Sequence, residues 1–142
     1  MKINKNLPLK ILIIANIKKG DFILMRKKFK GSKPYAETWY SFGCDFILGQ
    51  DPQFTFKTFI KSFLNIDVSF IKSLSWDLEI KNDIDGICKQ FIYLDAEFKY
   101  ISGDIIVPEG LEKVEWIPTN QLKNLDIVPP SVKLFKKLGY LN

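Results

Sequence analysis

The side chains that could carry chemistry in this chain are few in kind. The sequence has 142 residues and no histidine, and its two cysteines, Cys44 and Cys88, lie far apart without a Cys-x-x-Cys spacing. A zinc site built from cysteine and histidine is therefore excluded, and so is a mechanism with an imidazole base. We expect both thiols to be small, buried apolar groups in a reducing compartment. Carboxylates remain as the groups that could bind a metal or act as a base.

Three carboxylates are the main candidates for such a role. Glu112 and Glu115 lie in the segment LEKVEWIP, just before Trp116, and Asp45 lies in the segment FGCDF. Divalent cations such as Mg²⁺ take hard oxygen ligands, which these side chains could supply. A solvated carboxylate at the end of a strand is the simpler explanation for Glu112 and Glu115.

The strands that must position these groups follow from the apolar patterns. Short apolar or alternating runs separated by Gly, Pro, Asn and Asp are typical of strands. The predicted strands are residues 9–17, 22–28, 39–48, 67–79, 87–98 and 111–118. A Lys-Gly-Asp turn at residues 19–21 and a second turn at residues 82–86 predict two hairpins.

Two segments predict helices. Asp51 can cap a helix that begins at Pro52 and runs to about Asn65. Its apolar stripe, at i, i+3, i+4, i+7 and i+8, consists of Phe56, Phe59, Ile60, Phe63 and Leu64. Core packing and a nonpolar pocket for a ligand would both explain this stripe. The second helix follows Pro129–Pro130 and has Gly139 as its C-cap.

The order of these elements predicts the fold class. Strands flank a central helix and a second helix closes the chain, which indicates an α/β (α+β) fold with a mixed sheet sandwiched between helices. The length and the lack of a low-complexity linker predict one domain, residues 1–142. Residues 9–17 are too short to span a bilayer and no cleavage site follows them. We therefore expect a cytoplasmic protein that makes no membrane contact.

The basic residues do not favour a nucleic-acid-binding protein. The formal charge is +5, but the basic side chains occur in short scattered runs, at residues 18–19, 26–28 and 136–137. We interpret these runs as solvated strand ends and the end of a helix. They are not interleaved with exposed aromatic residues in a pattern that would track a strand of DNA or RNA.

Several phrases occur in an order that resembles the Nudix family, which hydrolyses nucleoside diphosphates linked to a further group. Trp39 precedes Phe42-Gly43-Cys44, where the family has Pro-Gly-Gly. The segment GQDP at 49–52 falls where members read Gly-Glu-Thr-Pro, and LNIDV at 64–68 falls on Leu-Gly-Ile-Asp-Val. LEKVEWIP and the closing LDIVPPSVKLFKKLGYL are similar to the family's last strand and last helix. The resemblance implies the Nudix fold.

The catalytic box of that family, G-x5-E-x7-R-E-U-x-E-E-x-G-U, aligns without a gap, but its charged positions are lost. Its opening glycine falls on Cys44 and its late glycine on Asn65, while Ile60 and Ile66 keep the aliphatic positions. The five charged positions are occupied by Gln50, Thr58, Phe59, Ser62 and Phe63. In the family, the glutamates of this box bind the divalent cations of the reaction.

The lost charges change the chemistry that this helix could support. Cleavage of a pyrophosphate requires divalent cations, and these require carboxylate or other oxygen ligands. Residues 52–65 contain no Asp or Glu and carry Lys57 and Lys61, which would repel a metal ion. We therefore expect no catalytic residue on this helix and no metal site. No cofactor is expected, and Mg²⁺ or Mn²⁺ would take part only if activity is retained.

Two functions remain open from the sequence. The first is a Nudix-fold protein without hydrolase activity, which binds a nucleotide-like small molecule or a protein partner such as a second copy of itself. Arg26 aligns with a basic residue that faces the substrate phosphate in the family. Tyr35, Trp39 and Trp76 could line a base pocket, although packing in the core or at its rim explains them equally well.

The second function is a residual metal-dependent pyrophosphohydrolase that uses relocated carboxylates. Glu112, Glu115, Asp45 and Asp51 are the candidates for that role, although a helix cap explains Asp51 better. Glu112 is the best match to a glutamate that contributes to catalysis in many family members.

Overall fold

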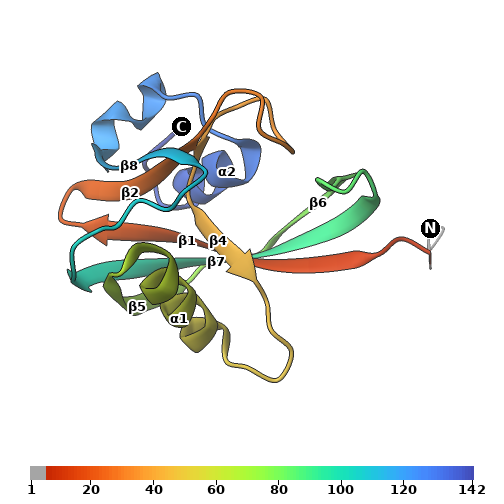
Figure 1. Ribbon diagram of the computed structural model, residues 1–142, viewed down its shortest axis with the longest axis horizontal. Coiled ribbons are helices and arrows are strands. Elements are labelled where there is room, and N and C mark those ends of the chain that lie inside the picture. Colours follow the sequence, from red (N-terminus) through yellow and green to blue (C-terminus); the bar gives the residue numbers. More distant parts are fainter. Residues whose placement is uncertain (1–5) are drawn as a thin grey trace.

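The computed structural model describes residues 6–142 and confirms the predicted mixed sheet with helices on either side (Figure 1). In chain order, the described elements are β1 (Leu9–Lys19), β2 (Phe22–Lys28), β3 (Trp39–Tyr40), β4 (Phe42–Asp45), α1 (Pro52–Leu64), β5 (Asp67–Ser73), β6 (Asp77–Asn82), β7 (Cys88–Ser102), β8 (Leu111–Pro118), the 3₁₀ helix η1 (Thr119–Asn124) and α2 (Pro129–Lys137). Within these residues, no helix is long and apolar enough to cross a membrane.

Strand β1 lies at the centre of the sheet. One of its edges pairs in parallel with β7 along residues 9–18. The other edge is shared, because β4 pairs with residues 12–15 and β2 pairs only with Lys18 and Lys19. Strand β7 is long enough to pair in turn with β6 and β5 on its far side. As a result, β2 and β4 diverge from one another along the same edge of β1.

The two helices cover opposite faces of the sheet, as the alternation along β1 requires. Ile13, Ala15 and Ile17 pack in a cluster with the buried side of α1. Ile14 packs instead against a second cluster that contains Leu134 and Phe135 of α2. Figure 1 shows α1 and α2 on opposite sides of the strands.

Helix α1 begins and ends as its sequence predicts. The side chain of Asp51 accepts a hydrogen bond from the backbone N–H of Gln53 at 2.9 Å, and Pro52 occupies the first turn. At its other end Asn65 adopts the left-handed conformation with φ 64° and closes the helix. Helix α2 ends one residue earlier than expected, with Leu138 as its C-cap and Gly139 following at φ 79°.

The predicted strand at residues 39–48 is shorter and divided. Trp39 and Tyr40 pair with β2, whereas residues 42–45 pair with β1, so the chain passes from one partner strand to the other at Ser41. The predicted strand at 67–79 is likewise divided, into β5 and β6, which pair with different halves of β7. In both places the strand is interrupted where the chain changes the strand with which it pairs. A local sequence pattern does not show with which strand a segment pairs.

Candidate functional site

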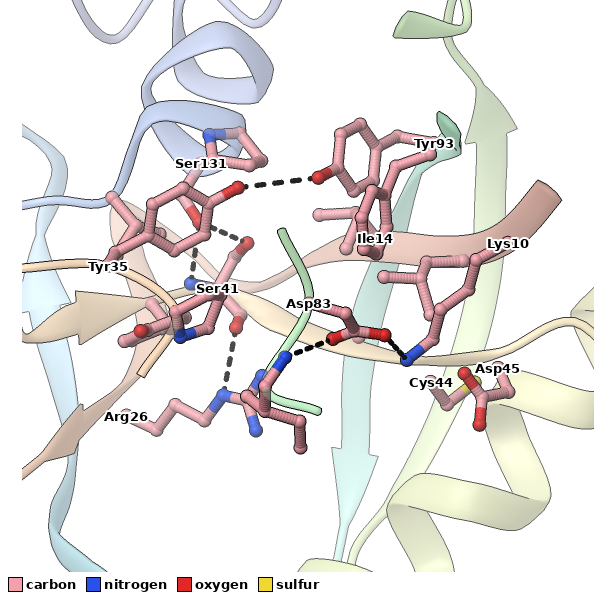
Figure 2. A pocket seen from close by; sticks show the side chains of 18 of the residues that line it. Lys10, Ile14, Arg26, Tyr35, Ser41, Cys44, Asp45, Asp83, Tyr93 and Ser131 are labelled. Carbon is pink, nitrogen blue, oxygen red and sulfur yellow. Dashed lines mark hydrogen bonds and ion pairs between the residues drawn. The ribbon is translucent and has the colours of Figure 1, made fainter. Parts of the chain in front are cut away.

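A cavity of about 470 Å³ is lined by residues of β1, β2 and β4, at the edge of β1 where β2 and β4 diverge from one another. We call it the main cavity. Its walls come from β1, β2, β3, β4, α1, β6, β7, α2 and the loop before β3. Figure 2 shows Arg26 and Tyr35 on the side of this cavity opposite to Cys44 and Asp45. A cavity of this size is typical of a small-molecule site.

Arg26 of β2 is the deepest cation of the main cavity. Its Nε donates a hydrogen bond to the backbone carbonyl of Ser41 at 3.1 Å, and its Cζ lies 5.4 Å from the ring centre of Tyr40 and 5.6 Å from that of Phe42. Ser41 is itself fixed, because its N–H donates to Ser131 Oγ of α2 at 3.0 Å. Burial lowers the pKa of Arg26 to about 10, so the guanidinium remains charged at neutral pH.

Lys28, two residues further along β2, shares this environment. Its Nζ lies 4.2 Å from the centre of the Tyr40 ring. Burial, followed by repulsion from Arg26 and Lys81, lowers the pKa of Lys28 to about 8. Among residues 6–142, neither Arg26 nor Lys28 forms an ion pair with a carboxylate. Removing a cation from water is costly unless a counter-charge is near, so these two partly buried cations leave the cavity with positive charge that no carboxylate among the described residues compensates.

The third cation, Lys81 of β6, is compensated within a compact network. Its Nζ lies 3.1 Å from Glu79 Oε1, donates to the hydroxyl of Tyr93 at 3.0 Å and contacts the hydroxyl of Tyr35. Both tyrosines donate to Glu79, at 2.6 Å from Tyr35 and 2.7 Å from Tyr93. Burial raises the pKa of Glu79, but the hydrogen bonds from Tyr35, Tyr93 and Lys81 outweigh it, so the net pKa is lowered. The network ties the loop before β3 to β6 and β7.

Of the residues that the structure describes, two carboxylates line the main cavity, and one of them is neutralised by lysines. Asp83 pairs with Lys10 and Lys89, each at 2.9 Å, and the hydrogen bond from Lys89 is the main reason that its pKa lies below the usual range. Asp45 is exposed and forms no ion pair among the residues that the structure describes. Burial and the neighbouring Asp45 raise the pKa of Cys44 to about 11, so this thiol is protonated and unreactive at neutral pH.

Helix α1 presents phenyl rings to the cavity. Phe59 and Phe63 line it, stacked with ring centres 5.1 Å apart and an interplanar angle of 19°. Phe63 also meets Phe42 edge-on at 6.4 Å. The apolar stripe of α1 is therefore divided between the core and the cavity. Phe56, Ile60 and Leu64 are fully buried in the core, whereas Phe59 and Phe63 are partly covered and line the cavity. The other three residues that align with charged positions of the motif lie outside the lining of the cavity: Gln50 accepts a hydrogen bond from Thr55, and Thr58 and Ser62 are exposed.

The structure brings together only some of the candidates from the sequence. Arg26, Tyr35 and Asp45 line the main cavity. Glu112 and Glu115 lie outside its lining, each 3.3 Å from a lysine on the surface. Their assignment to catalysis stays a prediction.

The two candidate tryptophans also lie apart from the main cavity. Trp39 is buried in the core beneath α2 and lines neither cavity. Trp76 is 76% exposed and borders a second cavity of about 330 Å³ near the start of α1.

Sequence reasoning missed several residues of the site. Lys28, Tyr40, Lys81 and Tyr93 all line the main cavity. The interpretation of residues 26–28 as a solvated strand end is wrong for Arg26 and Lys28, because alternate residues of β2 point toward the cavity. The i, i+2 spacing of two cations was the available signal for these two. Lys81 and Tyr93 come from a hairpin whose position beside the loop before β3 no local pattern indicates.

The residues of the main cavity do not fit a catalytic Mg²⁺ ion. Within residues 6–142, no group of three or more His, Cys, Asp or Glu side chains is placed to share a metal ion. Phe59 and Phe63 offer phenyl rings, and among the described residues that line the cavity Asp45 is the one carboxylate that is not paired with a lysine. Mg²⁺ needs several hard oxygen ligands, which this donor set lacks.

Comparison with solved structures identifies the fold. A MutT protein from Methanosarcina mazei Go1 superposes with a TM-score of 0.76 over 96% of both chains, at 12% sequence identity. A NUDIX hydrolase from Nitrosomonas europaea gives a TM-score of 0.72 at 9% identity, covering 93% of this chain and 88% of that one. The chain has the Nudix fold. A UDP-X diphosphatase gives 0.65 at 11% identity, covering 97% of this chain and 63% of that one.

The Nudix fold is detected by comparing structures and not by comparing whole sequences. No protein-family model and no curated protein sequence matches this chain. The solved Nudix structures with which it superposes share so few identical residues that they establish the fold alone. What the protein does must therefore be argued from the main cavity itself.

Proposed function

We propose that this Nudix-fold protein binds a small, anionic, ring-bearing ligand of the nucleotide kind in its main cavity and does not hydrolyse it with metal ions. The observation that carries the proposal is the pair Arg26 and Lys28, two cations in a cavity with no carboxylate partner among the described residues. A ligand anion would supply the missing counter-charge.

The aromatic walls support a ligand with a flat ring. Tyr35, Tyr40, Phe91 and Tyr93 line one part of the main cavity, and the stacked pair Phe59–Phe63 lines another. Aromatic side chains bind planar rings by stacking and by removing apolar surface from water. A cavity of about 470 Å³ is large enough for a nucleotide-sized molecule. One superposing structure is named for action on UDP-X, which is a ligand of this chemical class.

The loss of oxygen ligands supports binding without hydrolysis. The charged positions of the catalytic box are Gln50, Thr58, Phe59, Ser62 and Phe63 in this chain. A second candidate function, a residual metal-dependent pyrophosphohydrolase, is favoured by one observation: Asp45 lines the same cavity as Phe59 and Phe63 of α1. One carboxylate is a poor basis for such a reaction, which needs at least one well-held cation to activate water.

A hydrolysis screen and a binding screen of the same preparation would test the proposal. The panel contains nucleoside mono-, di- and triphosphates, nucleotide sugars, dinucleoside polyphosphates and ADP-ribose, each with Mg²⁺ or Mn²⁺, and an active Nudix hydrolase serves as the positive control. We expect no turnover above background and saturable binding of at least one compound. Turnover that a chelator abolishes and that Asp45→Asn removes would establish the hydrolase in its place.

A further inference from the structure

We infer that the ligand of the main cavity is a phosphomonoester on an uncharged ring, bound without a metal ion, with its phosphate on Arg26 and Lys28 and its ring on the Phe59–Phe63 face. This inference rests on the proposed function, and it specifies the chemical class and the orientation of the ligand. It follows from the charge balance of the cavity, the position of the two cations and the nature of the opposite wall.

The charge balance sets the number of negative charges that the ligand brings. Four basic side chains line the main cavity, and they are Lys10, Arg26, Lys28 and Lys81. Lys10 is 2.9 Å from Asp83, and Lys81 is 3.1 Å from Glu79, so each of these has its own carboxylate. Among the described residues, two unpaired cations therefore remain, Arg26 and Lys28, and the one unpaired lining carboxylate, Asp45, is exposed on the opposite side of the cavity. A phosphomonoester carries a charge of about −1.5 to −2 at neutral pH, which matches the two cations.

The position of the two unpaired cations suits one compact anion. Arg26 Cζ and Lys28 Nζ both lie over the ring of Tyr40, at 5.4 and 4.2 Å from its centre. They are close enough for Arg26 to help lower the pKa of Lys28. Arg26 has one guanidinium nitrogen engaged with the carbonyl of Ser41, which fixes its plane. The phosphate of a monoester has three free oxygens, so it could accept charge-assisted hydrogen bonds from both cations at once.

The opposite wall would not accept a chain of phosphates. It presents the stacked rings of Phe59 and Phe63, the protonated thiol of Cys44 and the carboxylate of Asp45. A second phosphate group directed there would meet phenyl carbon and the like charge of Asp45, and Lys10, the cation that Figure 2 shows on this side, is already paired with Asp83.

An uncharged ring fits this wall instead. Phe59 and Phe63 remain partly uncovered, so a flat ring placed on them would remove apolar surface from water. Arg26 and Phe63 both contact Phe42, at 5.6 and 6.4 Å from its ring centre, so the phosphate position and the ring position lie on neighbouring sides of one residue. One small molecule can therefore reach both.

Isothermal titration calorimetry with matched ligands would test this inference. The probes are the four common nucleoside 5′-monophosphates and phenyl phosphate, together with the corresponding nucleosides and nucleoside diphosphates, each in MgCl₂ and in EDTA. We expect at least one monophosphate to bind with the same Kd in both buffers. We expect the matching nucleoside to bind at least about tenfold more weakly, because the charge-assisted bonds to the phosphate are lost.

Two results separate this inference from the proposed function. If a diphosphate binds more tightly than the monophosphate in MgCl₂ and EDTA abolishes the difference, the inference is wrong and the binding function stands. If none of the nucleotides binds in either buffer, the proposed function fails, and the inference fails with it.

Variants of the protein test the orientation of the ligand. Arg26→Gln and Lys28→Gln should each weaken monophosphate binding by about tenfold to a hundredfold. The matched control is Lys27→Gln, since Lys27 lies between them on the other face of β2 and pairs with Glu112. Lys27→Gln should bind the monophosphate with the affinity of the wild type. If all three variants lost affinity equally, the placement of the phosphate on Arg26 and Lys28 would be wrong.

A second variant addresses the ring. Phe63→Leu keeps an apolar side chain against Phe42 but removes the aromatic face. It should weaken binding of a nucleoside monophosphate by about tenfold and leave the weak binding of inorganic phosphate unchanged. If Phe63→Leu weakened the binding of the nucleoside monophosphate and of inorganic phosphate by the same factor, the phosphate and not the ring would lie on α1, and the proposed orientation would be wrong.

Discussion

Replacement of Lys28 by methionine should make the ligand-free protein more stable. Lys28 is half-buried beside Arg26 and has no carboxylate partner among the described residues, and its pKa falls from 10.5 to about 8. Its charged form is therefore disfavoured in the folded state. Methionine has a similar length and no charge, so it keeps the packing of the stem and removes the electrostatic cost.

The magnitude follows from the shift in the pKa. One pKa unit corresponds to about 1.4 kcal/mol, and solvent screens a half-buried charge, so we expect Lys28→Met to raise the free energy of unfolding by about 1 to 2 kcal/mol at pH 7. In a protein of this size, that gain corresponds to an increase in Tm of roughly 2 to 8 °C. The same variant should lose affinity for anions, which is a trade of binding for stability.

The pH dependence gives the sign of the effect. Because the folded protein binds this proton less tightly than the unfolded chain, the penalty is complete below pH 8 and disappears as the pH rises from about 8 to 10.5. The stability difference between variant and wild type should therefore shrink to about half or less between pH 7 and pH 9.5. Other titrating groups are common to both proteins and cancel in the difference.

Urea unfolding followed by tryptophan fluorescence would measure these free energies. Lys27→Met is the control, because Lys27 faces away from the main cavity and its ion pair with Glu112 is on the surface, and it should change stability by less than about 0.5 kcal/mol. The reasoning is refuted if Lys28→Met is no more stable than the wild type at pH 7. It is also refuted if the gain is the same at pH 9.5.

Three further predictions concern the fold. Phe56→Ala should cost about 3 to 5 kcal/mol in a thermal or urea unfolding experiment because Phe56 is fully buried, whereas Phe54→Ala on the same helix should cost little because that side chain is 56% exposed. Asp51→Ala should cost about 0.5 to 2 kcal/mol by removing the N-cap of α1, and Asp51→Asn should restore most of it. Burial raises the pKa of Asp95 to about 7, so its contribution to stability is complete below about pH 4 and is lost as the pH rises to 7. A profile of Tm against pH should show this decline in the wild type, and Asp95→Asn should flatten it.

The sequence by itself determined the local structure of this protein and the kind of side chain at each position that aligns with the Nudix motif. An Asp-Pro pair and an apolar stripe fix the start and the buried side of α1, because capping and periodicity act over a few residues. The absence of charge at Phe59 and Phe63 can be read from an alignment with a motif, since the identity of a side chain needs no structure.

Only the tertiary structure decided which side chains share the main cavity. Arg26 and Lys28 looked like a solvated strand end, and they became cavity cations because β2 pairs with β1 at two residues only and then diverges from β4. Glu79 and Lys81 lie beside the predicted turn at residues 82–86, and nothing in their local sequence indicates that the loop with Tyr35 packs against them. Burial and unpaired charge are properties of neighbours distant in the chain, so the physical basis of a binding site appears only when the strands are assembled.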